Sequence, residues 1–257
     1  MALFAIHRLR ACEKIRSRLR SFARSHRLSQ PHQTGETQVL IFRKRETLLR
    51  EGEGGTLCHA DPATPEDLDW IFELEIDAYS SLYAVARRTL EHWYRANSDG
   101  FFILTQDGRK IGHLTIVPLH AKVLKSFDQG TILEQDIHED CLYTPRERHL
   151  IRNLYVESII LDGSKAPSVL PIKALSCLAH NFVPLIGRIC DPTQLENVYA
   201  LAASGRGERF MKGLGFDRIN SSQERSDQRA VYVAGFSSLK AKISELCNWR
   251  LRNAKAV

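Results

Sequence analysis

A strand, a short polar loop and a helix start follow one another within residues 153–179, and this succession constrains the fold more than any other stretch. Residues 154–161 (LYVESIIL) are an apolar run with β-branched and aromatic side chains, which is typical of a buried central strand. Asp162-Gly163 ends the strand, and Ser168 can cap a helix that tolerates Pro171 in its first turn. Loop amides and a helix N-terminus together favour a phosphate. We therefore expect a nucleotide or coenzyme A site here, with a ligand-free β–α unit as the alternative.

Positive charge is concentrated at the start of the chain. Residues 1–50 hold 12 Lys/Arg and 3 Asp/Glu, net +9, whereas the remainder holds 24 and 27, net −3. Residues 1–55 are interpreted as a basic N-terminal arm and linker, and residues 56–257 as one domain. Three interpretations of the arm stay open: a solvated segment, a contact with nucleic acid or another anionic surface, and an organellar targeting peptide.

Cysteine usage and hydropathy indicate the setting. The six cysteines include no CxxC pair, and basic residues interrupt the early apolar ones, so no secretory signal is apparent. These features favour a reducing, cytoplasmic localisation with free thiols. No apolar run approaches the length of a transmembrane segment.

Cap and turn signals predict the elements of the domain. Thr64 as N-cap and Pro65 at the first helical position predict a helix that reaches about Tyr79. Asp107-Gly108 between two alternating apolar runs, 101–106 and 110–117, predicts a type I′ hairpin. The remaining expected elements are strands at 57–60, 197–203 and 229–235 and helices at 84–96, 121–127, 206–212 and 239–253.

This order of elements resembles the GCN5-related N-acetyltransferases over roughly residues 56–236. Four pieces carry the resemblance: ATPEDLDWIFELE, GFFILTQDGRKIGHLTIVPL, LYVESIIL with its loop and helix, and ALAASGRGERFMKGLGF. The resemblance implies a mixed α/β fold with a central mixed sheet flanked by helices. It also implies that the fourth and fifth strands splay apart and that an acyl-coenzyme A, acetyl-coenzyme A or another, inserts between them as co-substrate.

The resemblance assigns the cofactor contacts. The backbone of Ile159, Ile160 and Leu161 would pair with the pantetheine arm. The pyrophosphate and pantetheine contacts would be completed by Gly163, Ser164, Lys165, Ala166 and Ser204. The DGSKAPS loop has one glycine where the family usually has two small residues, and Lys165 can add a charge contact to phosphate.

Glu157 is the candidate general base, because it is a carboxylate inside an apolar strand and partial burial would raise its pKa. The alternative is that Glu157 points to solvent or pairs with Arg152. The family often uses a tyrosine as general acid, but Met211 occupies that position and its thioether has no proton to give. Tyr199 is the candidate replacement, with Tyr155 or water as alternatives.

The sequence thus predicts an acyl-coenzyme A-dependent N-acyltransferase in which an amine attacks the thioester directly. The alternative is a non-catalytic module of the same fold that binds acyl-coenzyme A. The acceptor is expected to be an amine of a small molecule or a protein, which the acidic residues 134–140 would attract if they are more than a solvated loop. The cluster HEDC at residues 138–141 lacks a partner pair, so no metal site is expected.

Overall fold

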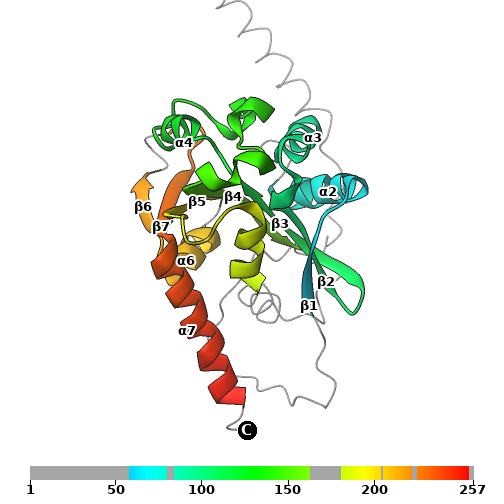
Figure 1. Cartoon of the computed structure of the whole chain (residues 1–257), viewed down its shortest axis with the longest axis vertical. Helices are drawn as coiled ribbons and strands as arrows, with labels where there is room; N and C mark the ends of the chain where they lie inside the picture. The colour runs from blue at the N-terminus through cyan, green and yellow to red at the C-terminus, as the bar shows by residue number, and fades with distance from the viewer. Residues whose placement is uncertain (1–57, 80–83, 163–180, 204, 222–224, 255–257) are drawn as a thin grey trace, which may run out of the picture. The chain divides into compact units, whose positions relative to one another are not determined.

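The computed structural model describes residues 58–79, 84–162, 181–203, 205–221 and 225–254 (Figure 1). The basic arm, the expected pyrophosphate loop and Ser204 lie outside these residues. The strands are β1 (Cys58–Pro62), β2 (Phe101–Gln106), β3 (Arg109–Val117), β4 (Asn153–Leu161), β5 (Asn197–Ala202), β6 (Asp217–Asn220) and β7 (Ala230–Gly235). The α-helices are α2 (Leu68–Tyr79), α3 (Arg87–Ala96), α4 (Ala121–Asp128), α6 (Gly205–Gly213) and α7 (Phe236–Ala254), and residues 181–189 are also helical. Short 3₁₀ turns are η1 (Pro65–Asp67), η2 (Ser98–Gly100), η3 (Glu134–Asp136), η4 (Glu139–Cys141) and η5 (Pro145–Leu150).

Within the described residues the strands form one seven-stranded sheet in the order β1-β2-β3-β4-β5-β7-β6. Neighbouring strands pair antiparallel except β4 and β5, which are parallel. The mixed α/β fold with helices flanking a central sheet is therefore confirmed. β6 is absent from the sequence prediction, because its short DRIN segment is largely exposed and shows no apolar run.

Local signals in the sequence explain two of these elements. Thr64 donates hydrogen bonds from its backbone N–H and its hydroxyl to Asp67, at 2.7 and 3.0 Å, so it stabilises the turn that leads into α2. Asp107 and Gly108 both have positive φ, 51° and 72°, which is the conformation that a type I′ turn requires. Both predictions are confirmed.

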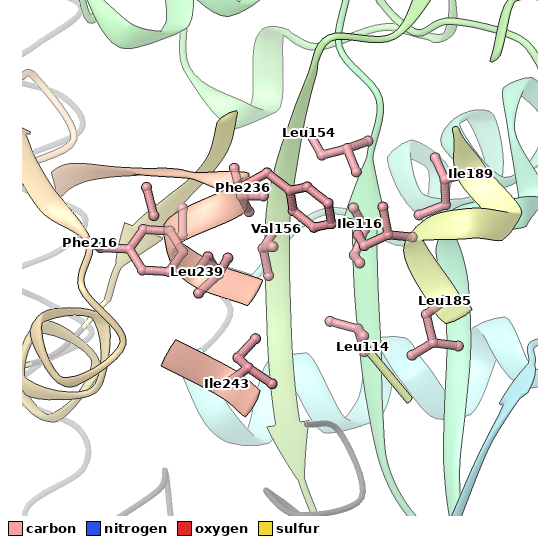
Figure 2. Close-up of a cluster of buried hydrophobic side chains, with 14 of the residues drawn as sticks. Leu114, Ile116, Leu154, Val156, Leu185, Ile189, Phe216, Phe236, Leu239 and Ile243 are labelled. Atoms are coloured by element: carbon pink, nitrogen blue, oxygen red, sulfur yellow. The ribbon is translucent and has the colours of Figure 1, made fainter. Parts of the chain in front are cut away.

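The core consists of two clusters, one on each face of the sheet. On one face the helix at 181–189 and α7 pack on the sheet, with Leu114, Ile116 and Val156 between them (Figure 2). On the other face α2, α3 and α4 cover the sheet, and Trp93, which is fully buried, donates from Nε1 to the Ile137 carbonyl at 3.0 Å. This second face receives the polar side chains described below. No helix among the described residues is long and apolar enough to cross a membrane.

Candidate functional site

The candidate site begins where the parallel strands β4 and β5 separate. They pair from Asn153–Asn197 to Val156–Ala200, and both strands continue beyond that point, to Leu161 and Ala202. Among the described residues no strand pairs with β4 on this side after Val156. Residues 157–161 therefore present an open backbone edge inside a sheet, which is the splay that the resemblance implies.

A β-bulge lies at the same point. On β3 the consecutive residues Thr115 and Ile116 pair with Ser158 and Val156, so Glu157 is the extra residue of β4. Bulges bend a strand and redirect side chains, and they are frequent beside active sites. Here the bulge lets both Glu157 and Ser158 interact with Glu75 of α2, although neighbouring strand residues normally face opposite sides.

One hydrogen bond sets which backbone groups face the open edge. The Asp162 N–H donates to the Ile111 carbonyl of β3 at 2.8 Å, and Leu161 pairs with Gly112. Alternation along the ladder then directs the N–H and C=O of Leu161 and Ile159 away from β3, toward the open edge. The same alternation directs the backbone of Ile160 toward β3. The edge can therefore offer hydrogen bonds to an extended ligand at Ile159 and Leu161.

Two carboxyl groups meet behind this edge. Glu75 is fully buried, and its Oε1 accepts a hydrogen bond from Ser158 Oγ at 3.3 Å. Glu157 is half-buried, its Oε2 is enclosed, and its carboxyl group shares a hydrogen bond with that of Glu75. Burial, reinforced by the charge of Glu134, raises the pKa of Glu75 to about 8. Burial, together with the neighbouring charge of Glu75, raises the pKa of Glu157 well above its ordinary range.

Such a pair retains a proton at neutral pH and can exchange it there, since two adjacent buried carboxyl groups do not both ionise. Proton exchange near neutral pH is what general acid–base catalysis requires. The expected rise in the pKa of Glu157 is thus found. The two alternatives, full exposure of Glu157 to solvent and an ion pair with Arg152, are not found. Arg152 donates a hydrogen bond to the His149 carbonyl at 3.1 Å instead.

His113 completes the buried group from β3. Its ring is fully buried, and its Nδ1 lies 3.4 Å from Thr115 Oγ1 and 3.5 Å from Ser158 Oγ. Burial lowers the pKa of His113 to about 3, so the ring is neutral at pH 7. His113 therefore adds hydrogen-bonding atoms beside the carboxyl pair without adding positive charge.

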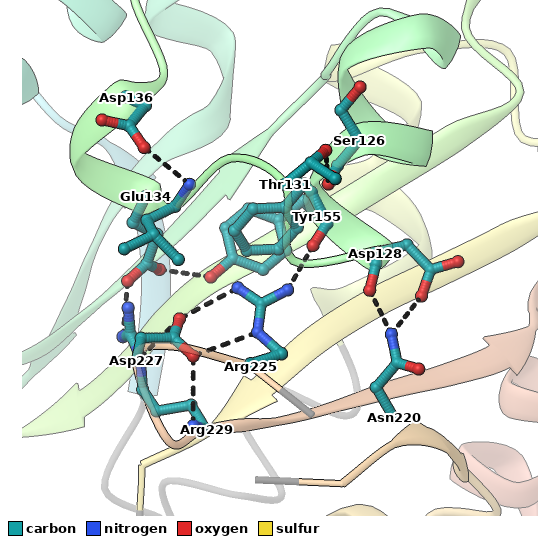
Figure 3. A network of polar contacts seen from close by, with 12 residues as sticks. Ser126, Asp128, Thr131, Glu134, Asp136, Tyr155, Asn220, Arg225, Asp227 and Arg229 are labelled. Atoms are coloured by element: carbon teal, nitrogen blue, oxygen red, sulfur yellow. Dashed lines mark hydrogen bonds and ion pairs between the residues drawn. The ribbon is translucent and has the colours of Figure 1, made fainter. Parts of the chain in front are cut away.

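Glu134, whose charge acts on both glutamates of the pair, belongs to a network of polar and charged side chains (Figure 3). The Tyr155 hydroxyl donates to Glu134, and Arg229 pairs with the other oxygen of Glu134 at 2.5 Å. Asp227 accepts from Arg225 at 2.9 Å and lies 3.5 Å from Arg229 Nε. The network thus links η3 to the segment before β7. It holds the guanidinium of Arg229 on Glu134 and Asp227 rather than on Glu75 or Glu157.

The predicted proton donors, Tyr199 and Tyr155, interact most strongly with carboxyl groups other than that of Glu157. Tyr199 is half-buried on β5, and after burial the charges that act on its pKa are those of Asp128 and Glu196, not of Glu157. Tyr155 has its hydroxyl on Glu134. Tyr79, at the end of α2, was not predicted, yet after burial the charge of Glu157 is the largest influence on its pKa, which is raised. Met211 is buried in the apolar core.

Of the predicted site residues, the structure therefore brings Glu157 and the backbone of Ile159 and Leu161 to one place. The predicted contacts at Gly163, Ser164, Lys165, Ala166 and Ser204 lie outside the described residues. Within the described part of the chain no group of three or more His, Cys, Asp or Glu residues could hold a metal ion.

Comparisons with known proteins bear on the fold. Neither a protein-family model nor a curated protein sequence matches the chain. Among solved structures, the loading GNATL domain of CurA from Lyngbya majuscula is 11% identical, with 70% of this chain and 98% of that chain covered and a TM-score of 0.49. The GphF GNAT-like decarboxylase in complex with isobutyryl-CoA is 15% identical, with 69% and 99% covered and a TM-score of 0.47.

Ard1 from Thermoplasma volcanium is 11% identical, with 68% of this chain and 94% of that chain covered and a TM-score of 0.41. These likenesses are too distant to carry a functional argument. The central mixed sheet flanked by helices and the separation of β4 from β5 are the features that the resemblance implies. The fold of the GCN5-related N-acetyltransferases is therefore confirmed by the sheet itself.

Proposed function

We propose that this protein is an acyl-coenzyme A-dependent N-acyltransferase, with acetyl the expected acyl group. The observation that carries the proposal is the separation of β4 from β5 at Glu157. It combines an open backbone edge, which can hold an extended thioester substrate, with an enclosed carboxyl group of raised pKa. Positioning and proton transfer are the two contributions that amide formation from a thioester needs.

In the proposed reaction the backbone of Ile159 and Leu161 pairs with the pantetheine arm. The carbonyl of the thioester then lies near the bulge, where an amide of the open edge stabilises the oxyanion. Glu157 receives a proton from the acceptor, and the neutral amine attacks the thioester carbon. The C–N bond forms, the C–S bond breaks, and the proton that the nitrogen then loses passes to the coenzyme A thiolate. The expected pyrophosphate contacts at residues 163–166 and the contact at Ser204 remain part of this proposal.

Binding of acetyl-coenzyme A and of coenzyme A, measured by calorimetry and thermal shift, tests the proposal first. Saturable binding at micromolar ligand, with a melting temperature that rises with ligand concentration, is the expected result. If neither acetyl-coenzyme A nor coenzyme A binds to the protein, the proposed co-substrate is rejected.

Turnover with a panel of amines is the second test. Glu157→Gln should bind acetyl-coenzyme A within about twofold of the original protein but lose about 10²–10⁴-fold in kcat. Glu73→Gln is the matched control, because Glu73 is an exposed glutamate on α2 and should leave both values unchanged.

A non-catalytic acyl-coenzyme A-binding module is the second candidate function. One observation favours it: Met211 stands where the family often has its proton-donating tyrosine, and it is buried in the apolar core. Tight binding of acetyl-coenzyme A without turnover of any amine in the panel would support this candidate over the enzyme.

A further inference from the structure

The separation of β4 from β5 divides the described sheet into two parts. One part is β1-β2-β3-β4 and the other is β5-β7-β6, and antiparallel ladders join the strands within each part. Between the parts lies one parallel ladder of four residue pairs, from Asn153–Asn197 to Val156–Ala200. Because this ladder is short and stands at one end of the gap, it alone leaves the width of the gap beyond Val156 free to vary.

An ion pair joins the two parts a second time (Figure 3). The Tyr155 hydroxyl of β4 donates to Glu134, which anchors Glu134 on the first part. Arg229 precedes Ala230, which pairs with Ala202 at the end of β5, so Arg229 belongs to the second part. Glu134 Oε2 and Arg229 Nη1 lie 2.5 Å apart. We call Tyr155, Glu134 and Arg229 the cross-strand tie.

Neighbouring side chains brace the tie. Asp227 accepts a hydrogen bond from Arg225 at 2.9 Å and lies 3.5 Å from Arg229 Nε. Arg225 is buried, donates to the Phe127 carbonyl, and has its guanidinium 4.8 Å from the centroid of the Phe127 ring. That ring centroid lies 4.8 Å from the centroid of the Tyr155 ring. The brace thus runs from the segment before β7 through α4 back to β4, beside the ion pair.

Opening the gap would have to stretch the ion pair of the tie. The side chains of Glu134 and Arg229 are 7% and 15% exposed, so the pair lies largely out of water. Separating two such charges leaves each without its partner in a poorly solvating environment, which is strongly unfavourable. The tie therefore resists a movement of β5 away from β4.

We propose that the cross-strand tie fixes the separation of β4 from β5 and thereby sets the size of the acyl group that the gap admits. Its three residues are then positioning residues, which determine acyl specificity without touching the reacting atoms. The proposal rests on the proposed acyltransferase function, in which the acyl-coenzyme A lies in this gap, and it adds the selection of the acyl group.

The place of the acyl group in the gap gives the physical reason for this selection. With the pantetheine arm on Ile159 and Leu161, the thioester lies near the bulge and the acyl group points toward the Val156–Ala200 pair, where the gap closes. Val156 and Leu201, the first β5 residue after that pair, are 7% and 9% exposed, so this end of the gap is closely packed. An acetyl group needs little room there, whereas the ring of a benzoyl group requires the strands to move apart.

Calorimetry of the full chain with acetyl-coenzyme A and benzoyl-coenzyme A tests the proposal. The original protein should bind acetyl-coenzyme A more tightly by about tenfold or more. Arg229→Met combined with Glu134→Gln removes the tie without leaving an unpaired charge, and it should reduce this preference by about threefold or more. Tyr155→Phe, which releases Glu134 from β4, should reduce the preference by a smaller factor.

The matched control is Leu90→Ala. Leu90 is fully buried on α3, so this variant loses stability through a cavity but keeps the tie, and its preference for acetyl should stay unchanged. Equal binding of the two compounds by the original protein, an unchanged preference in both tie variants, or an equal fall in Leu90→Ala would overturn the proposal. If the double variant does not fold, Tyr155→Phe decides.

The separation of the two parts is measured without any coenzyme A. Spin labels on p-acetylphenylalanine, introduced in place of Arg109 and Asp217, report the distance between exposed positions of the two parts. The double variant should show longer or more widely distributed distances than the original protein, and Leu90→Ala should not. Unchanged distances would overturn the proposal. If acetyl-coenzyme A does not bind, the proposed function is rejected, but these distances still decide whether the tie holds the strands, so the two failures are distinguishable.

Discussion

Glu75 and His113 lie in the same buried group, yet folding shifts their titration in opposite directions. The pKa of Glu75 rises from 4.5 to about 8, so between these values the folded state holds more protons than the unfolded state. Its contribution to the free energy of unfolding is present below pH 4.5 and is lost as the pH rises through 8. The pKa of His113 falls from 6.5 to about 3, so its contribution is present above pH 6.5 and is lost as the pH falls through 3.

We therefore expect the two groups to offset each other between pH 4.5 and 6.5 and to act separately outside that window. Relative to the original protein, Glu75→Gln should gain stability as the pH rises from 4.5 to 8, by up to about 1.4 kcal/mol per pH unit. His113→Gln should lose less stability than the original protein as the pH falls from 6.5 to 3. Urea unfolding from pH 3 to 9 measures both. If the free energy of unfolding of the three proteins varied with pH in parallel, the shifted pKa values of Glu75 and His113 would be contradicted.

The residues of the site differ in how far the sequence predicts them. Glu157 could be predicted because a carboxylate interrupts an apolar strand. Glu75 carries a weaker signal: helical spacing places it on the apolar face of α2 with Leu68 and Ile71, where a charged residue is out of place. Its pairing with Glu157 depends on a bulge, which is set by the register between β3 and β4 and has no local sequence pattern.

At the scale of elements, β3 pairs with β4 along the side opposite the open edge, and the close approach of the two strands depends on Gly112. A Cβ on Gly112 would lie 2.3 Å from the Ile160 carbonyl oxygen and 3.1 Å from Leu161 Cα, both backbone atoms. Gly112→Ala should therefore force the strands apart and destabilise the protein by about 1–3 kcal/mol. Gly213→Ala is the control, because a Cβ there meets no atom within 4 Å. Equal midpoints of urea unfolding for the two variants would contradict the close approach.

The buried ion pair of Glu134 with Arg229 ties η3 to the segment before β7. Their side chains are 7% and 15% exposed, so Arg229→Met would leave the carboxylate of Glu134 enclosed without its partner. We expect a loss of about 3–5 kcal/mol. Adding Glu134→Gln to Arg229→Met should recover part of it, because the uncompensated charge is then removed.

The control for this pair is Lys242→Met. Lys242 and Glu245 form an ion pair at 2.9 Å on α7, but their side chains are 41% and 65% exposed. Solvent screens such a pair, so the loss should stay below about 1 kcal/mol. Denaturant unfolding of the four proteins measures all these differences. A loss at Arg229 no larger than that at Lys242 would show that the network contributes little.

Elements with strong local signals were predicted, and those without were not. The Thr64–Asp67 turn and the Asp107-Gly108 hairpin follow from residues three or fewer apart, so their chemistry is visible in the sequence. β6 is held by its pairing with β7. No local residue pattern states which two segments pair, so the sequence alone did not predict this strand. The separation of β4 from β5 was expected from the resemblance alone, because no residue pattern states where two parallel strands cease to pair.

At the scale of the whole chain, positive charge is divided unevenly. Residues 1–35 hold 8 Lys/Arg and 1 Asp/Glu, net +7, and since the whole chain is +6, residues 36–257 are net −1. Attraction to a polyanion would therefore depend on the first 35 residues. We expect the full chain to bind duplex DNA with an affinity that falls steeply with salt, and a chain of residues 36–257 to bind at least about tenfold more weakly with a smaller salt slope.

The matched control separates charge from length. Replacing Arg16, Arg18 and Arg20 with lysine keeps the charge and should keep the affinity and the salt slope, whereas replacing them with glutamine should lower both. Fluorescence anisotropy with a labelled duplex at several salt concentrations measures these quantities. Equal affinity of residues 36–257 and the full chain, or equal slopes for the lysine and glutamine variants, would show that the arm does not bind through its charge. The nucleic-acid interpretation of the arm would then be rejected, which leaves the solvated segment and the targeting peptide, and the proposed transferase chemistry at Glu157 would be unaffected.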